Sequence, residues 1–265
     1  MNSDAISFDV SGEVGWITMA RPKKHNAFDD GLIADLTSAF AHAGRDDAVR
    51  VVVLAGEGKS FSAGADLAWM ERMADYSDAA NLEDARKLAH MLRALNELPR
   101  PTIARVQGAA FGGGVGLVAA CDIALASRTA SFCLSEVRLG LIPSVISPYV
   151  VEAIGSRAAR RYFQTAERFD AGEAHALGLV HEVVPNERLD SRLEELVDQL
   201  LENGPEAMAA SKDLVRRVMA GAVDDDMVAD TARRIADIRA TDEGREGLRA
   251  FLEKRRPAWQ KMKKP

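Results

Sequence analysis

Cysteine is scarce in this sequence, and long apolar runs are missing. The two cysteines, Cys121 and Cys133, cannot form a disulfide scaffold for 265 residues, and their apolar surroundings predict buried thiols. The longest apolar run, Ala109 to Cys121, has 13 residues, or 14 with Gly108, fewer than the ~20 that cross a bilayer. The first ten residues show no basic region followed by an apolar stretch. We therefore expect a globular, cytoplasmic protein without a membrane span.

Aromatic side chains and excess positive charge are also limited. The chain has nine phenylalanines, three tyrosines and three tryptophans, and its formal net charge is −6. Single-stranded nucleic acids are bound by stacked aromatics beside cationic grooves, so this composition argues against a broad nucleic-acid surface. The five histidines lack the spacing of a zinc site, and no Cys-x-x-Cys occurs. We expect neither a bound metal nor a nucleic-acid partner.

Strand and helix patterns alternate in the first part of the chain, and helices dominate after about residue 145. Hydrophobic patterns predict strands at residues 6–10, 14–19, 49–55, 102–106, 122–126, 130–134 and 179–184. They predict helices at residues 30–43, 80–97, 113–120, 156–164, 187–202, 205–220, 225–240 and 243–255. This order predicts an α/β core over residues 1–200 and a C-terminal helical region over residues 201–265, within one structural unit.

Two familiar nucleotide-binding motifs match only in part. Gly58-Lys59-Ser60 resembles the end of a phosphate-binding loop, but the first glycine of that motif would fall on Val53. The run from Gly114 to Ala119 fits GxGxxA, but the strand that follows ends at Ser127-Arg128 without the carboxylate that would hold a ribose. We therefore expect no nucleotide cofactor at either motif.

Two turns rich in small residues each follow a buried strand and open a helix. They are Phe61 to Leu67 and Gly108 to Gly114. A turn of small residues at a helix start leaves backbone N–H groups unpaired, at the positive end of the helix dipole. Two such turns facing each other would stabilise an oxyanion. Considered alone, each turn could instead contain small residues only because the backbone packs closely there.

Several motifs occur in an order that resembles the crotonase (enoyl-CoA hydratase/isomerase) superfamily. They are RPKKHNAF, FSAGADL, QGAAFGGGVGLVAACDIALAS, FCLSEVRLGLIP and AxxLGLVxEVV. The likeness runs from about residue 6 to the stretch around residues 246–255, which is nearly the whole chain. The resemblance implies a crotonase-like α/β spiral of strand-strand-helix units. It also implies C-terminal helices that build a homotrimer or a dimer of trimers.

The same resemblance assigns roles to particular residues. It implies that the N–H groups of Ala65 and Gly113 hold the thioester oxygen of an acyl-CoA. It implies that Phe251 and Lys254 reach the adenine end of CoA in a neighbouring subunit. It places the other substrate contacts at Lys23, Lys24, Ala63, Asp66, Leu67, Gly112 and Gly116. No separate cofactor is implied, because coenzyme A is part of the substrate.

Glu136 matches the position of a catalytic glutamate in that family. Hydratases with two glutamates carry the other one three residues after the oxyanion glycine, and here that position is Gly116. A single acid leaves two reactions open. Glu136 could activate water for hydration of the double bond, or it could carry a proton between carbons for isomerisation.

Two further stretches bear on the substrate and on possible partners. Gly140 to Tyr149, with the sequence GLIPSVISPY, resembles the branch that acts on 3-methylglutaconyl-CoA, and this favours hydration. From residue 246 onward the chain has seven basic and two acidic side chains. Such a tail suits a CoA phosphate or a solvated helix end. RNA binding, which has been associated with one relative of that branch, is the alternative from another functional class.

Overall fold

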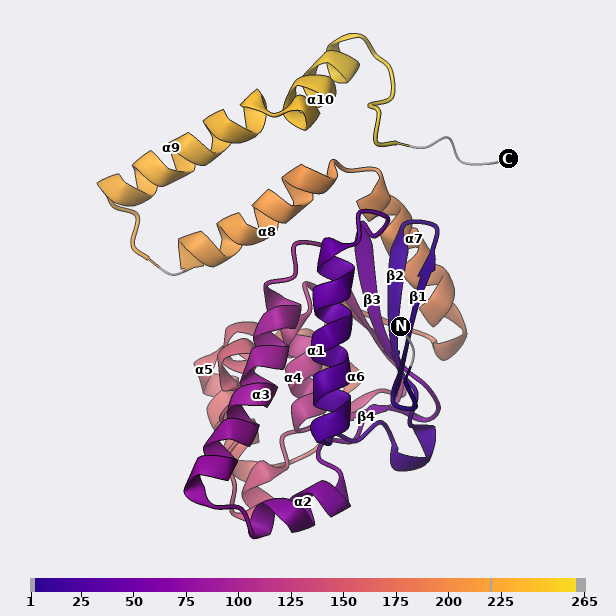
Figure 1. The fold of residues 1–265 in the computed structure, drawn as a ribbon, viewed down its shortest axis with the longest axis vertical. Helices are drawn as coiled ribbons and strands as arrows, with labels where there is room; N and C mark the ends of the chain where they lie inside the picture. The colour runs from indigo at the N-terminus through magenta and orange to yellow at the C-terminus, as the bar shows by residue number, and fades with distance from the viewer. Residues whose placement is uncertain (1–2, 220, 261–265) are drawn as a thin grey trace.

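The main sheet of the protein has six strands. A computed structural model describes residues 3–219 and 221–260, and it confirms the predicted α/β class (Figure 1). The strand order is β1-β2-β3-β5-β7-β10, with β1 and β2 as an antiparallel hairpin and the remaining pairs parallel. The strands are β1 (Ile6–Ser11), β2 (Val14–Met19), β3 (Val51–Gly56), β5 (Thr102–Val106), β7 (Ile123–Ser127) and β10 (Glu182–Val184).

A second, smaller sheet positions the site. It contains β4 (Ser60–Ser62), β6 (Ala109–Phe111), β8 (Ser131–Cys133) and β9 (Phe169–Asp170), in that order. Three consecutive pairs of strands, β3 with β4, β5 with β6 and β7 with β8, each give one strand to each sheet. Because β4, β6 and β8 run in parallel, the segments that follow them begin at the same edge.

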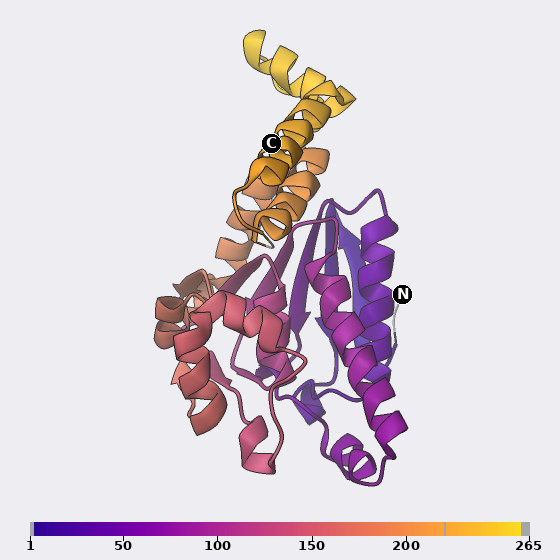
Figure 2. The same ribbon diagram turned by 90° about the vertical axis from the view of Figure 1, so that its left-hand side faces the viewer.

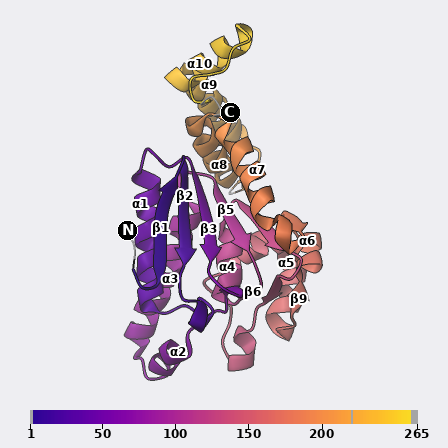
Figure 3. The same ribbon diagram turned by 90° about the vertical axis from the view of Figure 1, so that its right-hand side faces the viewer.

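Helices cover both faces of the main sheet (Figures 2 and 3). Alternate residues of β3 face opposite sides: Val52 and Leu54 join the larger apolar cluster, while Val51 and Val53 pack in a smaller one with α7. Both cysteines are buried, as predicted. The core helices are α1 (Asp30–Arg45), α2 (Leu67–Ala74), α3 (Asp78–Asn96), α4 (Gly113–Ala120), α5 (Ser147–Thr165), α6 (Ala171–Leu177) and α7 (Leu189–Leu201). Three short 3-10 helices are η1 (Pro22–Lys24), η2 (Glu136–Leu139) and η3 (Asn186–Arg188).

The last three helices form an arm that projects from the core. We call α8 (Pro205–Met219), α9 (Asp225–Ala240) and α10 (Asp242–Leu252) the arm. It lies at the end of the core opposite α2 (Figures 1 and 3). Arg50, just before β3, contacts the segments that flank the arm: it donates to the carbonyl oxygens of Leu201 and Asn203, before α8, and of Trp259, after α10.

Some predicted boundaries were wrong. The helix expected at 156–164 begins at Ser147, and Gly155 (φ 73°) interrupts it with a kink, so the pattern revealed only the part after the kink. The strand expected from 179 is Glu182–Val184. The sequence patterns predicted neither α6 nor β9, since both are too short to show a period. No helix in the described residues is long and apolar enough to cross a membrane, and the cytoplasmic location stays a prediction.

Candidate active site

The two glycine-containing turns meet at one edge of the small sheet. β4 and β6 pair in parallel, with Ser62 opposite Ala110. A Cβ atom on Gly64 would lie 3.1 Å from the carbonyl oxygen of Phe111 and 3.9 Å from the Cα of Gly112. Gly64 also has a φ of +90°, which favours glycine. The prediction that the turns come together is therefore supported by direct backbone contact between them.

Phe28 contacts both turns. Its N–H donates to the oxygen of Gly64 at 2.6 Å, and its carbonyl accepts from the N–H of Asp66 at 2.7 Å. These are the bonds of a parallel bridge with Ala65, so they leave the N–H of Ala65 directed to the other side of the backbone. The Phe28 ring packs on Gly113, where a Cβ atom would lie 3.0 Å from its Cε2. One residue thus fixes the segments that carry both predicted oxyanion donors.

The backbone amides of Ala65 and Gly113 have no hydrogen-bond acceptor among the residues that the structure describes. Gly113 is the first residue of α4, after Gly112 with φ 50° and ψ −119°. The first N–H groups of a helix have no acceptor in the helix itself. Within residues 3–219 and 221–260, neither N–H donates a hydrogen bond. Unpaired donors at the start of α4 can stabilise negative charge that develops on an oxygen.

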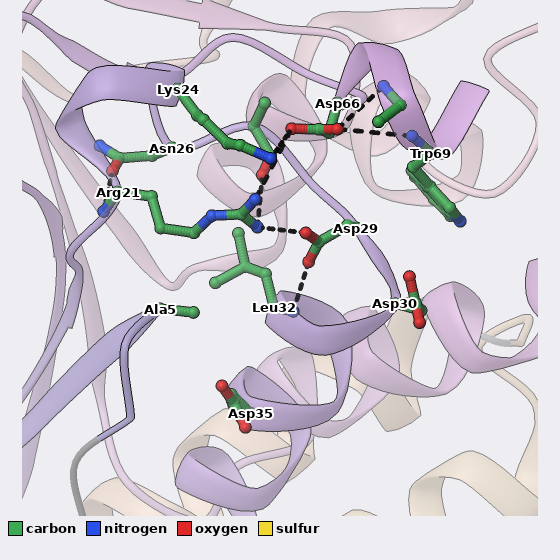
Figure 4. Close-up of polar contacts among 12 residues, drawn as sticks. Ala5, Arg21, Lys24, Asn26, Asp29, Asp30, Leu32, Asp35, Asp66 and Trp69 are labelled. Atoms are coloured by element: carbon green, nitrogen blue, oxygen red, sulfur yellow. Dashed lines mark hydrogen bonds and ion pairs between the residues drawn. The ribbon is translucent and has the colours of Figure 1, made fainter. Parts of the chain in front are cut away.

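Asp66 fastens the first turn to the start of α2. One carboxylate oxygen accepts from the N–H of Ala68 at 3.0 Å, and the other lies 2.9 Å from Nζ of Lys24 and 3.6 Å from Arg21 (Figure 4). Arg21 also pairs at 2.7 Å with Asp29, which caps α1. The hydrogen bond from Lys24 holds the pKa of Asp66 below its usual range. The network ties two helix starts to the loop that contains Ala65.

The side chains predicted to contact CoA surround this network. Lys24 and Asp66 pair with each other, and Asp66 is buried. Lys23 is exposed, Ala63 is half-buried, and Leu67 is 75% exposed. The carboxylate of Asp66 is therefore occupied within the protein, while Lys23, Lys24 and Leu67 present surface to solvent. Contact of these residues with CoA stays a prediction.

Asn26 supports the same loop, although no role was predicted for it. It is fully buried, with a φ of 54°. Its side chain donates to the carbonyl oxygens of Glu57, Ser60 and Phe61 and accepts from the N–H of Arg21 at 2.9 Å. The available signal was its residue type, because asparagine tolerates left-handed backbone and offers donors and an acceptor together.

Glu136 lies beside the second turn. It opens η2 just after β8, and β8 is tied to the turn by a hydrogen bond from the N–H of Gly112 to the oxygen of Cys133 at 2.9 Å. A Cβ atom on Gly112 would lie 3.3 Å from Oε1 of Glu136. Oε2 is buried and has no hydrogen-bond partner in the described residues. Burial raises the pKa of Glu136, which makes the carboxylate a stronger base than a surface glutamate.

Gly116 lies on the same helix, one turn after Gly113, and is buried. Ile146 and Leu92 pack against its Cα. Apolar side chains therefore fill the space that the side chain of a second acid at position 116 would need. The sequence identified the missing glutamate at Gly116, but it did not identify Ile146 as the residue that fills the space.

Phe251 and Lys254 do not join the site within one chain. Phe251 is 82% exposed on α10, and Lys254 follows that helix with a φ of 55°. The arm and α2 lie at opposite ends of the molecule (Figure 1). A contribution of these two residues to CoA binding would therefore require a second copy of the chain.

Comparison with known proteins identifies the family. Residues 9–262 match the profile of the family described as "Enoyl-CoA hydratase/isomerase". The chain belongs to this crotonase family. A crystal structure of an enoyl-CoA hydratase from Shewanella pealeana shares 47% identity and a TM-score of 0.94, with 96% of each chain covered. The short-chain-enoyl-CoA hydratase of Clostridium acetobutylicum is 30% identical over 262 residues, which is 97% of each protein.

A third relative supports the same assignment. The enoyl-CoA hydratase ACTT6 of Alternaria alternata is 36% identical over 214 residues, 80% of this chain and 70% of that protein. The predicted resemblance and spiral fold are thus confirmed, and the chain is an enzyme of a family named for enoyl-CoA substrates. In the part of this crotonase that the structure describes, no three His, Cys, Asp or Glu residues could together hold a metal ion.

Proposed function

We propose that the protein is an enoyl-CoA hydratase that adds water across the 2,3 double bond of an acyl-CoA thioester. The observation that carries this proposal is the placement of one buried carboxylate, Glu136, beside the turn that presents the free amide of Gly113, with the free amide of Ala65 on the turn that contacts it. Donors arranged in advance for an enolate oxygen lower the barrier, because they bind the transition state more strongly than the substrate.

In the proposed reaction the thioester oxygen accepts hydrogen bonds from the N–H groups of Ala65 and Gly113. Glu136 takes a proton from water while the water oxygen bonds to C3, and the electrons of the C2–C3 double bond move onto the thioester oxygen. The protonated Glu136 then gives its proton to C2, which restores the carbonyl and the carboxylate. Its raised pKa suits both steps near neutral pH. The reaction needs no cofactor besides the CoA of the substrate.

A second candidate is a Δ3,Δ2-enoyl-CoA isomerase. It is favoured by Gly116, since moving a proton between C4 and C2 needs only one acid and no bound water. Hydration has the stronger support, because the stretch from Gly140 to Tyr149 resembles the hydratase branch that acts on 3-methylglutaconyl-CoA. We therefore propose a branched, carboxylated 2-enoyl-CoA as the substrate class.

Absorbance of the conjugated thioester separates the two candidates. A hydratase removes the absorbance of a 2-enoyl-CoA, whereas an isomerase creates it from a 3-enoyl-CoA. Glu136→Gln should lower kcat by about 10²–10⁴-fold. The matched control Glu194→Gln changes an exposed glutamate of α7 and should leave kcat unchanged. Full activity of Glu136→Gln would refute the mechanism, and a gain of absorbance only from the 3-enoyl-CoA would favour the isomerase.

We also propose that the arm assembles copies of this chain into a trimer or a dimer of trimers. The arm exposes Val215, Val228, Leu248, Phe251 and Leu252, among others, which suits burial against a neighbour. In such an assembly Phe251 and Lys254 could complete a CoA site of the next subunit. Light scattering, which measures the molar mass of the purified protein, tests this assembly. A mass of one chain at micromolar concentration would contradict it. If the protein bound RNA, it would shift the mobility of the RNA in a gel, and the shift would weaken as the salt concentration rises. We expect no such shift.

A further inference from the structure

Ile146 fills the space beside Gly116, one helical turn beyond the amide of Gly113. A Cβ atom at position 116 would lie 2.9 Å from Cβ of Ile146, still closer to its Cγ2, and 3.7 Å from Cδ2 of Leu92. Real Cβ atoms essentially never approach another atom within 3.0 Å. Ile146 is only 3% exposed and directly precedes α5, so it has little room to move away. Any residue larger than glycine at position 116 must therefore displace Ile146.

The direction of a side chain at position 116 connects this space to the chemistry. In an α-helix the Cα–Cβ bonds tilt toward the N-terminus, and a long side chain lies over the preceding turn. A carboxylate at position 116 would thus extend back toward Gly112 and Gly113. Oε1 of Glu136 lies 3.3 Å from the Cβ position of Gly112. Two acids would then share one site.

One segment of the chain supplies both the acid and the apolar wall. Glu136 begins η2, and the loop after η2 leads to Ile146 at the start of α5. The loop turns back at its beginning, where the N–H of Leu141 donates to the carbonyl oxygen of Glu136 at 3.1 Å. At its end the N–H of Val150 donates to the oxygen of Ile146 at 3.1 Å, which anchors Ile146 on α5. The segment therefore presents the carboxylate at one end and hydrocarbon at the other.

We propose that Ile146 is a specificity-determining residue that limits this site to one acid. Its side chain occupies the volume that a second carboxylate would need and places hydrocarbon beside Gly116. All proton transfer to and from the substrate then passes through Glu136. This inference rests on the proposed function for its chemistry, but the packing that it depends on can be tested without any substrate.

Thermal unfolding of Gly116→Ala tests the packing. Alanine favours a helix over glycine, so without the obstruction this change would raise the Tm. With Ile146 in place we expect overpacking to lower the Tm by roughly 5 °C. In the Ile146→Ala background the same change should lower the Tm by clearly less, because Cγ2 of residue 146 is gone and only its Cβ, at 2.9 Å, still crowds the new methyl group. Ile154→Ala serves as the matched control: it removes a buried isoleucine from α5, the helix that Ile146 precedes, and in that background Gly116→Ala should lower the Tm by the full amount.

The double variant Gly116→Glu/Ile146→Ala tests the number of acids. We expect the pH profile of its kcat/KM for a 2-enoyl-CoA to gain a second ionisation that the Ile146→Ala variant lacks. Its Tm should also fall more steeply with rising pH than that of Ile146→Ala, because two neighbouring carboxylates repel each other when ionised. This second measurement needs no activity.

The outcomes separate the two claims. If Gly116→Ala raises the Tm in the wild-type background, or changes it equally with and without Ile146, the role of Ile146 is refuted. An unchanged pH dependence of both kcat/KM and Tm in the double variant would refute it as well. If the wild-type protein turns over neither enoyl-CoA isomer, the proposed function fails, while the Tm comparison still decides whether Ile146 closes the space at Gly116.

Discussion

The α/β core and the arm of α8–α10 bury their apolar side chains to very different extents. All six residues of β3 are buried, and the strands around it continue the same core. In the arm, Met227 and Ala250 are buried, α8 has no buried residue, and many apolar side chains are exposed. Half-buried ion pairs join α8 to α9, including Asp213 with Arg234 at 2.6 Å.

Because of this difference, the two regions are stabilised by different interactions. Burial of apolar surface stabilises the core by about 25 cal/mol for each Å². Ion pairs that solvent still reaches contribute only about 0–1 kcal/mol each, so the pairs between α8 and α9 cannot hold the arm by themselves. We therefore expect the order of the arm to depend on contacts outside its own helices. Such contacts with the core come from Lys212 of α8, which lies 2.8 Å from Asp122, and from Arg50, which binds the segments that flank the arm. Contacts with another copy of the chain are the alternative. Substitutions matched between the two regions test this comparison.

Replacement of a glycine should show the largest contrast. In Gly114→Ala the new Cβ would lie 2.5 Å from the carbonyl oxygen of Ser62, and backbone cannot yield easily there. We expect a loss of about 3 kcal/mol in the free energy of unfolding. In Gly221→Ala, between α8 and α9 of the arm, the new Cβ meets nothing closer than 3.4 Å, and the free energy of unfolding should change by less than about 0.5 kcal/mol. Urea titrations measure both, and equal losses would contradict the comparison.

Removal of Arg50 should loosen the attachment of the arm to the core, although the pair of Lys212 with Asp122 remains. Its side chain is 8% exposed and donates to three carbonyl oxygens, those of Leu201 at 3.0 Å, Asn203 at 2.6 Å and Trp259 at 3.0 Å. Arg50→Met should cost about 2 kcal/mol and make the arm sensitive to limited proteolysis. Arg233→Met removes an exposed pair with a 4.0 Å separation and should change neither readout. An intact arm in Arg50→Met would show that other contacts hold it.

Two helix-capping aspartates, one in each region, should show a smaller difference in stability. Asp66 caps α2 and pairs with Lys24, whereas Asp224 caps α9 in the arm. We expect losses of about 1.5 kcal/mol for Asp66→Ala and about 1 kcal/mol for Asp224→Ala at pH 7. Since the pKa of Asp66 is lowered, its contribution is present above about pH 4 and is lost as the pH falls further. Melting curves at pH 7 and pH 3 check this, and a loss independent of pH would contradict it.

The elements of the core could be predicted where the local pattern was long and periodic. The stretch from Thr102 to Val106 is a strand as predicted, and α4 spans the predicted residues 113–120. Asp29 directly precedes the helix predicted from residue 30, and its carboxylate caps that helix by accepting from the N–H of Leu32. Such features depend on neighbours in sequence, so a sequence can show them.

The missing parts of the site depend on contacts between distant segments. Phe28 joins two turns that lie far apart along the chain, and Ile146 packs on Gly116 from another element. Asp66 matched a position for CoA contact, yet its carboxylate is used for a helix cap and two ion pairs. No local pattern encodes these tertiary contacts, whereas the turn glycines and Glu136 were accessible from motif order alone.

Burial of Glu136 in the core should reduce stability. Its Oε2 is buried and has no hydrogen-bond partner in the described residues, and burial raises its pKa, so the folded protein binds the proton more tightly than the unfolded chain does. Stability from this group is therefore greatest at low pH and falls as the pH rises past the pKa of an unfolded glutamate. Glu136→Gln keeps the shape without the charge, so at pH 7 it should raise the Tm by about 2 °C while activity is lost.

The gain should vanish at about pH 4, where the wild-type carboxyl is protonated in both states. Glu194→Gln, on the exposed side of α7, should leave the Tm unchanged at either pH. A lower Tm for Glu136→Gln at pH 7 would mean that the ionised carboxylate is stabilised by contacts in solution. Burial of the ionised Glu136 would then cost no stability. In this respect Glu136 would not differ from the solvent-exposed carboxylates of the arm.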